Sequence, residues 1–315
     1  MVLITGANGF LGQKLCKDML QQGWRVKAAT RSLDSIIEGV EPAIVGSIDG
    51  ETRWVDVLGN VDTVVHLAAH AHIIHDEATD SLAEFRAVNV DGTLNLARQA
   101  VKAGIKRFLF LSTIGVNGNA THGVPFDELS KPAPYSGYTT SKYEAEQGLQ
   151  EIASKSSMEV VIIRSPLVYG PNAPGNFARL INLTSKSYPL PLGAIRNQRS
   201  IISIYNLIDF IVTCIDEPQA ANQIFMVSDG EDLSTTELIC RLAAALNVPT
   251  RLLPVPQKFL KACFVLLGKG SLAQQLCGSL QVDITKAVKM LDWNPPVSVN
   301  EGLRHTAEYF LQSRD

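Results

Sequence analysis

The sequence of 315 residues lacks any apolar run long enough to span a membrane. The most apolar stretch, FLKACFVLLG at 259–268, falls short of the roughly 18 residues that a span requires, and Lys261 interrupts it. We therefore expect no membrane span. The amphipathic spacing of this stretch predicts a helix that docks on the protein, with contact to a membrane surface as the alternative.

Paired cysteine motifs are also missing. Five cysteines are an odd number, and no two of them form a C-x-x-C pair, which argues against a disulfide framework and a zinc site. We expect reduced, mostly buried thiols in a cytoplasmic protein, and no signal peptide, because the first apolar strand begins at Met1. The cysteines are Cys16, Cys214, Cys240, Cys263 and Cys277.

Neither sign of charge is in clear excess. The chain has 28 basic and 31 acidic residues, interspersed, for a formal charge of −3. This balance indicates no binding of nucleic acid or of an anionic membrane, so small molecules are the expected partners. A hydrophobic content of 46% in a chain of this length predicts a large core, divided between two lobes.

Short apolar runs alternate with helical patterns through the first half of the chain. Near-continuous apolar strands belong to a sheet that is covered on both faces, and strand–helix–strand repetition gives parallel pairing. We predict an α/β fold with a doubly wound parallel sheet of the Rossmann type. The expected strands are 1–5, 25–30, 42–47, 63–68, 107–113 and 159–165, and helices are expected at 10–23 and 93–104.

After Tyr169 the composition changes, because residues 169–200 are rich in Pro, Gly and Asn. We expect a smaller C-terminal α/β lobe to begin there and to bind the substrate. The predicted dinucleotide-binding domain comprises 1–168 with about 201–227, and the predicted substrate lobe comprises 169–200 and 228–315. Further strands are expected at 200–203 and 223–229, and closing helices at 283–291 and 299–311.

The motif TGANGFLG places Gly6, Gly9 and Gly12 directly after the first strand and into the first helix. Glycine is needed where the chain turns tightly, where backbone approaches a pyrophosphate and where helix presses on strand. In this strand-to-helix context the motif predicts dinucleotide binding, and the alternative is a glycine-rich turn that only packs.

A second motif, GYTTSKYEAE, supplies Tyr138 and Lys142 at the start of a predicted helix. Four residues apart, they share one helical face, so the ammonium group is expected to lower the pKa of the phenol and prepare it for general acid/base work. Tyr135 and Tyr143 have no lysine four positions on, and we interpret them as packing residues.

The segment HLAAHAHIIH contains His66, His70, His72 and His75, which raises the question of a metal site. No carboxylate or cysteine spacing completes a ligand set, so no metal is expected. His66 lies on a predicted strand and is interpreted as a core residue, whereas the later histidines are expected to line the substrate cleft.

The spacing G-x-x-G-x-x-G, with HLAA at 66–69 and NVDGT at 89–93, resembles the extended short-chain dehydrogenase/reductases of the NAD-dependent epimerase/dehydratase family, over essentially the whole chain. Ser47 stands where many members carry an aspartate near the adenine. The resemblance implies that Ile48 flanks the adenine and that Asn89 braces the central strands. It further implies a pyrophosphate site formed by Gly6, Gly9, Phe10, Leu11 and Gly12, and a nicotinamide-ribose site formed by Leu67, Ala68 and Ala69.

The same resemblance assigns the chemistry. Tyr138 and Lys142 would contact both cofactor and substrate, and Thr113, at the end of strand 107–113, takes the place of the family's catalytic Ser or Thr, with Ser112 as the alternative. On the substrate side, the resemblance implies that Arg199 grips a nucleotide diphosphate. The other implied substrate contacts are Asn176 and His70, and Asp283 and Lys286 lie in a region that contacts nucleotide in other members.

Within the family, the chain is similar to bacterial surface-polysaccharide enzymes that epimerise or reduce UDP-N-acetylated hexoses at C4. Dehydration is disfavoured because Thr113-Ile114-Gly115 lacks the acidic pair that dehydratases carry. A sensor that binds dinucleotide without turnover is a distant alternative, because such relatives usually lack the Tyr and Lys pair. Homodimers are common in the family, which leaves a homodimer open.

The cofactor prediction depends on Thr30, Arg31 and Ser32, where a site for NAD usually has an acidic residue. Arg31 and Ser32 suit a 2′-phosphate, so NADP(H) is favoured and NAD(H) stays open. A net reductase draws on NADPH, whereas an epimerase keeps NAD bound. We therefore favour NADPH-dependent C4 reduction of a UDP-2-acetamido-2,6-dideoxy-hexos-4-ulose, with a UDP-sugar 4-epimerase as the alternative.

Overall fold

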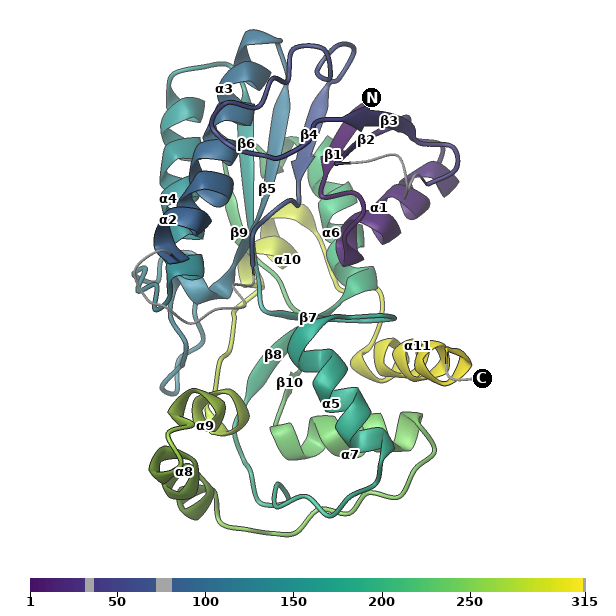
Figure 1. Cartoon of the computed structure of the whole chain (residues 1–315), viewed down its shortest axis with the longest axis vertical. Helices are drawn as coiled ribbons and strands as arrows, with labels where there is room; N and C mark the ends of the chain where they lie inside the picture. The colour runs from purple at the N-terminus through teal and green to yellow at the C-terminus, as the bar shows by residue number, and fades with distance from the viewer. Residues whose placement is uncertain (32–36, 72–80, 314–315) are drawn as a thin grey trace.

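The computed structural model describes residues 1–31, 37–71 and 81–313. Ser32, His72 and His75 lie outside the described residues. The chain forms an upper lobe around a large sheet and a lower lobe around a small one (Figure 1).

The large sheet has seven strands in the order β3-β2-β1-β4-β5-β6-β9, and every neighbouring pair is parallel. This arrangement confirms the doubly wound Rossmann fold predicted from the alternating pattern. Its strands are β1 (Val2–Thr5), β2 (Val26–Thr30), β3 (Glu41–Ile44), β4 (Thr63–His66), β5 (Arg107–Thr113), β6 (Glu159–Ser165) and β9 (Ile224–Met226).

Each face of this sheet has its own apolar core, because successive strand residues point to opposite faces. In β4, Val64 packs into one core and Val65 into the other. In β5, Phe108 belongs to the first of these and Leu109 to the second. One face is covered by α3 (Thr93–Lys102) and α4 (Gly137–Ser154), and the other by α1 (Phe10–Gln21), α6 (Ile204–Asp216) and α10 (Thr285–Leu291) (Figure 1).

The order of the strands reverses between β1 and β4. From β1 the chain proceeds outward to β2 and β3, and from β4 it proceeds the other way to β5, β6 and β9. In open parallel sheets the ligand binds at the carboxyl ends of the strands beside such a reversal. The residues after Thr5 and after His66 are therefore placed where a dinucleotide binds.

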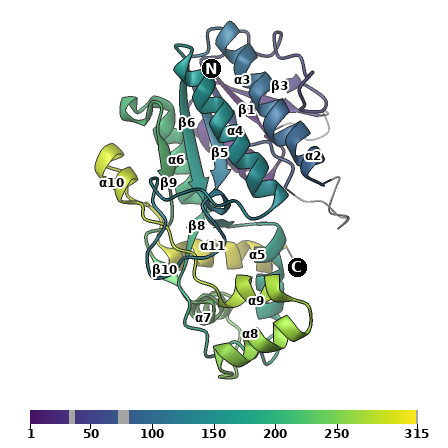
Figure 2. The ribbon, with the colours of Figure 1, turned by 90° about the vertical axis from the view of Figure 1, so that its left-hand side faces the viewer.

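The lower lobe is built on a three-stranded sheet in the order β10-β8-β7. Helix α7 packs against both α5 and α11, and the three helices share one apolar cluster (Figure 2). No helix among the described residues meets the length and hydropathy that a membrane crossing requires. The elements are β7 (Leu167–Tyr169), α5 (Gly175–Ser185), β8 (Arg199–Ser203), β10 (Asp232–Leu233), α7 (Thr235–Ala245), α8 (Gln257–Leu266), α9 (Gly270–Cys277) and α11 (Val299–Gln312).

Most predicted boundaries agree closely with the observed ones. Strands expected at 107–113 and 159–165 have those bounds. The strand expected at 42–47 is shorter, because Gly46 adopts a positive φ of 64° that ends the extended run. The stretch 200–203 is a strand, but it pairs in the small sheet rather than in the large one.

Candidate active site

The glycine turn after β1 is built by close backbone contacts. Gly6 has a φ of 69°, and a Cβ there would lie 2.8 Å from the Ala68 nitrogen. A Cβ on Gly12 would lie 2.2 Å from the Gly6 oxygen, so only glycine lets α1 approach this turn. Gly9 caps α1, and it has no side chain that could accept from the N–H groups of the first turn. This cradle suits an anionic pyrophosphate.

Other residues assigned to the cofactor lie around the same edge of the sheet. Phe10 and Leu11 open α1 and are half-buried. Leu67, Ala68 and Ala69 follow β4 directly, and the Ala68 N–H donates to Thr5 Oγ1 at 3.3 Å.

The residues that the resemblance assigns to the adenine and its ribose follow β2 and β3 at this edge. Ile48 packs against Gly92, where an added Cβ would lie 2.9 Å from Ile48 Cγ2. Arg31 is exposed directly after β2. The Ser47 hydroxyl donates to Asp49, which also accepts from Thr52 Oγ1, so this loop is held by local hydrogen bonds.

Asn89 lies on a π-helical segment, Ala87–Gly92, between α2 (Ser81–Arg86) and α3. Its side chain accepts from the His70 N–H at 2.8 Å and donates to the His70 carbonyl and to Ser141 Oγ, both at 3.0 Å. Ser141 in turn donates to the Tyr138 carbonyl. Asn89 thus ties the loop after β4 to the helix that carries Tyr138, instead of bracing the central strands themselves.

Tyr138 begins α4, whose start is fixed by a capping box between Ser136 and Thr139. Its ring meets Phe85 edge-on with centroids 6.0 Å apart, and Phe85 meets His70 in the same way at 5.6 Å. His70, Phe85 and Tyr138 therefore form one aromatic row at the candidate site.

Lys142 is fully buried one turn after Tyr138, with its Nζ 3.9 Å from the centroid of the Phe110 ring. Burial lowers the pKa of Lys142 to about 7, and the Glu146 carboxylate opposes that shift. Burial also raises the pKa of Tyr138 to about 12. The expectation that the ammonium lowers the phenol pKa is therefore wrong for this structure, because burial and, to a smaller extent, the Tyr135 phenol both raise the pKa of Tyr138.

The two hydroxyls at the end of β5 have different surroundings. Thr113 is half-buried, and its Oγ1 accepts from the Gly115 N–H at 3.1 Å in a short turn of 3₁₀ helix. Ser112 is buried, and its hydroxyl donates to Glu146. Of the two, Thr113 is the hydroxyl that a substrate can reach.

Behind Ser112 lies a buried ion pair between Glu146 of α4 and Arg164 of β6, with Nη2 and Oε2 2.6 Å apart. Both side chains are at most 3% exposed. Arg164 also donates from Nη1 to Asn117 Oδ1 at 3.0 Å. This cluster, Ser112, Glu146, Arg164 and Asn117, joins β5, α4 and β6, and its Glu146 lies about two turns after Tyr138 on α4.

Arg199 is the first residue of β8 in the lower lobe. Its Nη1 donates to the Gly278 carbonyl at 3.1 Å, and burial lowers its pKa, while the nearby Tyr135 phenol acts in the opposite sense. Asn176, on the first turn of α5, is exposed and donates to Gln275 at 3.5 Å. Both predicted substrate residues thus contact the segment that includes α9.

Tyr135 is 57% exposed, so its interpretation as a packing residue is wrong. A Cβ added at Gly115 would lie 3.4 Å from Tyr135 Cε1, and charge on this phenol acts on both Tyr138 and Arg199. Tyr135 therefore lies between the catalytic and substrate residues proposed from the sequence.

His66 is a core residue, as predicted. It is fully buried, with Nδ1 2.7 Å from Thr5 Oγ1 and Nε2 2.9 Å from Thr93 Oγ1. Burial lowers its pKa to about 3, with a smaller contribution from Lys142, so the ring is neutral at pH 7. Among residues 1–31, 37–71 and 81–313, no cluster of three His, Cys, Asp or Glu side chains could hold a metal.

The side chains of Asp283 and Lys286 both make hydrogen bonds to the backbone. Asp283 accepts from the Thr285 N–H just before α10. Lys286 donates to the Ile224 carbonyl at 2.8 Å, and its Nζ lies 5.0 Å from the centroid of the Phe225 ring.

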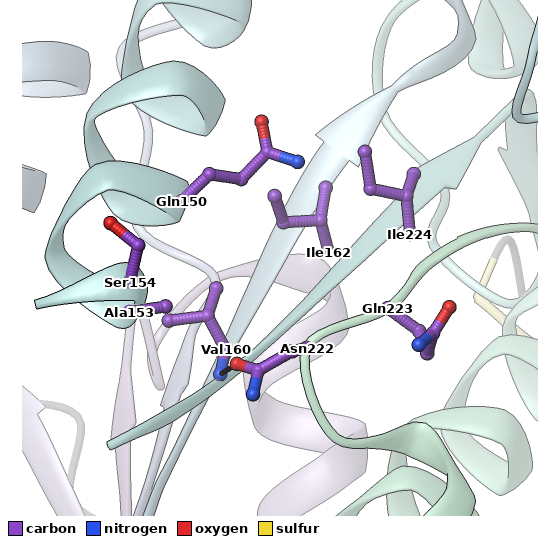
Figure 3. A pocket seen from close by; sticks show the side chains of 8 residues that line it. All are labelled: Gln150, Ala153, Ser154, Val160, Ile162, Asn222, Gln223 and Ile224. Atoms are coloured by element: carbon purple, nitrogen blue, oxygen red, sulfur yellow. Dashed lines mark hydrogen bonds between the residues drawn. The ribbon is translucent and has the colours of Figure 1, made fainter. Parts of the chain in front are cut away.

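A separate cavity of about 290 Å³ lies at the β6–β9 side of the large sheet, beside the C-terminal half of α4 (Figure 3). It includes Val160 and Ile162 from the first half of β6, whereas the candidate site lies at the carboxyl ends of the strands. It contains none of the predicted site residues. The lining residues are Gln150, Ala153, Ser154, Val160, Ile162, Asn222, Gln223 and Ile224.

Four residues of this site were not predicted from the sequence: Phe85, Tyr135, Glu146 and Arg164. Two of them left a readable signal. Glu146 follows Lys142 by four residues and so shares its helical face, and Arg164 interrupts an otherwise apolar strand, which indicates a buried partner.

Comparison with known proteins gives consistent results. The model of the NAD dependent epimerase/dehydratase family matches residues 2–228. A UDP-glucose 4-epimerase of Vibrio cholerae is 47% identical over 317 residues, covering 100% of this chain and 96% of the relative. An N-acetyl-alpha-D-glucosaminyl-diphospho-ditrans,octacis-undecaprenol 4-epimerase of Escherichia coli O157:H7 is 28% identical, with 98% and 94% covered. The solved UDP-N-acetylglucosamine 4-epimerase of Bacillus cereus has a TM-score of 0.81 at 22% identity, with 100% and 99% covered.

Proposed function

Because the chain belongs to the NAD-dependent epimerase/dehydratase family, we propose that it inverts the configuration at C4 of a UDP-hexose, with NAD as the resident cofactor. The observation that carries this proposal is the Vibrio cholerae relative, which is 47% identical over the whole chain and named a UDP-glucose 4-epimerase. This choice gives priority to the function that the sequence analysis held as its alternative.

The proposed cofactor site combines the glycine turn with the residues after β2, β3 and β4. Residues 1–168 with about 201–227 would hold the dinucleotide, and 169–200 with 228–315 would hold the UDP-sugar. Bound NAD supplies a hydride acceptor at C4 and then the donor that returns it. The cysteines are unpaired, which supports a reducing, cytoplasmic location.

We assign the proton transfer to Tyr138. Its phenolate takes the proton of the C4 hydroxyl as the C4 ketone forms, and returns it when C4 is reduced on the opposite face. Because burial raises the pKa of this phenol to about 12, most of it is protonated at pH 7, and the small phenolate fraction takes the proton. The Thr113 hydroxyl donates to the same C4 oxygen and holds it beside Tyr138.

A second candidate is the NADPH-dependent reduction of a UDP-2-acetamido-2,6-dideoxy-hexos-4-ulose. Arg31 favours it, because this guanidinium is exposed directly after β2, where a 2′-phosphate would bind. Dehydration stays disfavoured, since Thr113 is followed by Ile114 and Gly115.

One incubation experiment separates these candidates. Purified protein is incubated separately with UDP-glucose, with UDP-N-acetylglucosamine and with a polyprenyl-diphosphate N-acetylhexosamine. A further incubation contains a UDP-4-keto-sugar with NADH or NADPH. Products are identified by mass spectrometry and NMR. The epimerase predicts interconversion of two sugars without net redox change. Stoichiometric consumption of NADPH with the 4-keto-sugar would replace it with the reductase, and no turnover of any substrate would favour the sensor.

Arg31→Ala tests the cofactor directly. For a reductase, loss of one charge-assisted contact of roughly 1.5 to 3 kcal/mol should weaken NADPH binding about 10- to 100-fold and leave NADH unchanged. For the proposed epimerase, we expect neither affinity to change more than a few-fold. Fluorescence titration measures both, and Arg25→Ala, at the opposite end of β2, is the matched control.

Arg199→Ala tests the substrate lobe. If the guanidinium binds the diphosphate in both ground state and transition state, KM should rise about 10- to 100-fold, corresponding to roughly 1.5 to 3 kcal/mol, while kcat changes little. Steady-state kinetics with the substrate identified above measure this, and Arg251→Ala, exposed elsewhere on the same lobe, is the control. An unchanged KM would remove Arg199 from the diphosphate site.

A further inference from the structure

Helices α8 and α9, with the joining residues 267–269, form a hairpin at the end of the lower lobe, which we term the α8–α9 tip. Both views show the two helices side by side at the periphery of the lower lobe, with α9 nearer the upper lobe and α8 farther from it (Figures 1 and 2). The sequence analysis expected the first of these helices to dock on the protein, with a membrane surface as the alternative.

The α8 helix carries large apolar residues both on its docked side and on an exposed side. Leu260 is buried and Phe264 is half-buried against the cluster beneath the tip, which accounts for docking. On the other side, Phe259 is 62% exposed and Leu266 is 86% exposed, and their spacing of two turns puts them on one line. Docking therefore explains only half of the apolar content. The exposed large apolar residues of the tip are Phe259, Val265, Leu266, Leu267 and Leu272.

The charge of this region is entirely positive. The sequence has no Asp or Glu from 238 to 282, although acidic residues outnumber basic ones in the whole chain. Lys258, Lys261 and Lys269 are exposed around the apolar line. None of the three forms an ion pair with an acidic side chain in the part of the chain that the structure describes. The overall balance of charge conceals this local asymmetry.

We propose that the α8–α9 tip binds the surface of an anionic lipid bilayer, with the apolar line in the acyl boundary and the three lysines at the head groups. Interfacial helices combine an apolar face with flanking Lys or Arg, and each basic residue near an anionic surface adds attraction. The cores of protein–protein interfaces are depleted of lysine, and a partner protein would have to neutralise all three. The composition therefore fits lipid better than a second copy of the chain.

The tip also contacts the candidate substrate site. Gln275 of α9 accepts from Asn176, and Gly278, just after α9, accepts from Arg199. Gln274 donates to the Asn119 carbonyl at 3.2 Å, on the loop that follows β5. Docking on a bilayer would thus hold these substrate-side residues close to the membrane surface.

The experiment is co-sedimentation of the full-length protein with vesicles of phosphatidylglycerol and phosphatidylcholine, or of phosphatidylcholine alone. We expect binding to the anionic vesicles that weakens as salt is raised, and little binding to the neutral ones. The double variant Phe259→Asp/Leu266→Asp should lower the partition coefficient roughly tenfold or more, equivalent to about 1.4 kcal/mol per decade. The double variant Lys258→Gln/Lys261→Gln should also lower the partition coefficient on anionic vesicles.

Leu129→Asp is the matched control, because Leu129 is 92% exposed on a loop outside the tip and should leave binding unchanged. Thermal unfolding and near-UV circular dichroism establish that each variant is folded. Absence of wild-type binding to anionic vesicles, or equal binding by the tip variants, overturns the proposal. If sedimentation velocity without lipid instead shows a dimer that the Asp variant converts to monomer, and vesicles do not bind, the tip is a contact between two copies.

Discussion

Tyr138→Phe is expected to lower kcat roughly 10²- to 10⁴-fold, which is the usual contribution of a positioned general acid/base. The change removes the phenol oxygen and leaves the ring, so the edge contact with Phe85 is retained. The hydrogen bonds that anchor this turn of α4 involve the Tyr138 carbonyl, which the substitution does not touch. Steady-state turnover of the UDP-sugar measures the effect.

The binding of NAD should change little in the same variant, and calorimetric titration checks this. Tyr143→Phe is the matched control, since Tyr143 is half-buried five residues later on the same helix and has no lysine four positions on. A Tyr138→Phe enzyme within a few-fold of wild type would show that another group moves the proton.

Arg164→Met is expected to destabilise the fold by about 3 to 5 kcal/mol, the usual cost of leaving one member of a buried ion pair without its partner. Glu146 is 1% exposed and would retain only the Ser112 hydroxyl as a donor from this cluster. Asn117 would lose the donor to its Oδ1 as well. Urea unfolding followed by far-UV circular dichroism gives the change in free energy.

Replacing both partners separates the ion pair from packing. The double variant Arg164→Met/Glu146→Leu leaves no charge in the site and should recover most of the lost stability. Arg86→Met is the control, because the Arg86–Glu144 pair has similar geometry on the surface and should contribute far less. A double variant no more stable than Arg164→Met would indicate that side-chain packing, not the unpaired carboxylate, causes the loss.

The fold was predictable because the strands of the large sheet are short apolar runs, and because a glycine turn follows the first strand. The helix that carries Tyr138 was predictable because a local motif, GYTTSKYEAE, marks its start. What the sequence could not predict depends on distant contacts. The role of Asn89 needs a π-helical turn and a loop 19 residues away, and the raised pKa of Tyr138 depends on burial that no spacing reveals.

The ion pair of Glu146 and Arg164 could not be predicted from the sequence either, because it joins α4 to the buried strand β6. The sequence marks each residue as one that needs a buried partner, but which residues pair depends on how α4 lies across the sheet. Tyr135 was misjudged because its exposure is set by the extended loop before α4, whose course no periodic pattern records.

The pairing of β6 with β9 has a consequence for synthesis on the ribosome. After β6 ends at Ser165 the chain builds β7, α5, β8 and α6 before β9 begins at Ile224. Until then β6 is an open edge with unpaired backbone groups, which is a template for aggregation. A nascent chain that ends near residue 168 therefore cannot complete the sheet of its own first lobe. The two lobes are interleaved in the order of their translation, and cutting the gene at the apparent boundary would release an unfinished sheet.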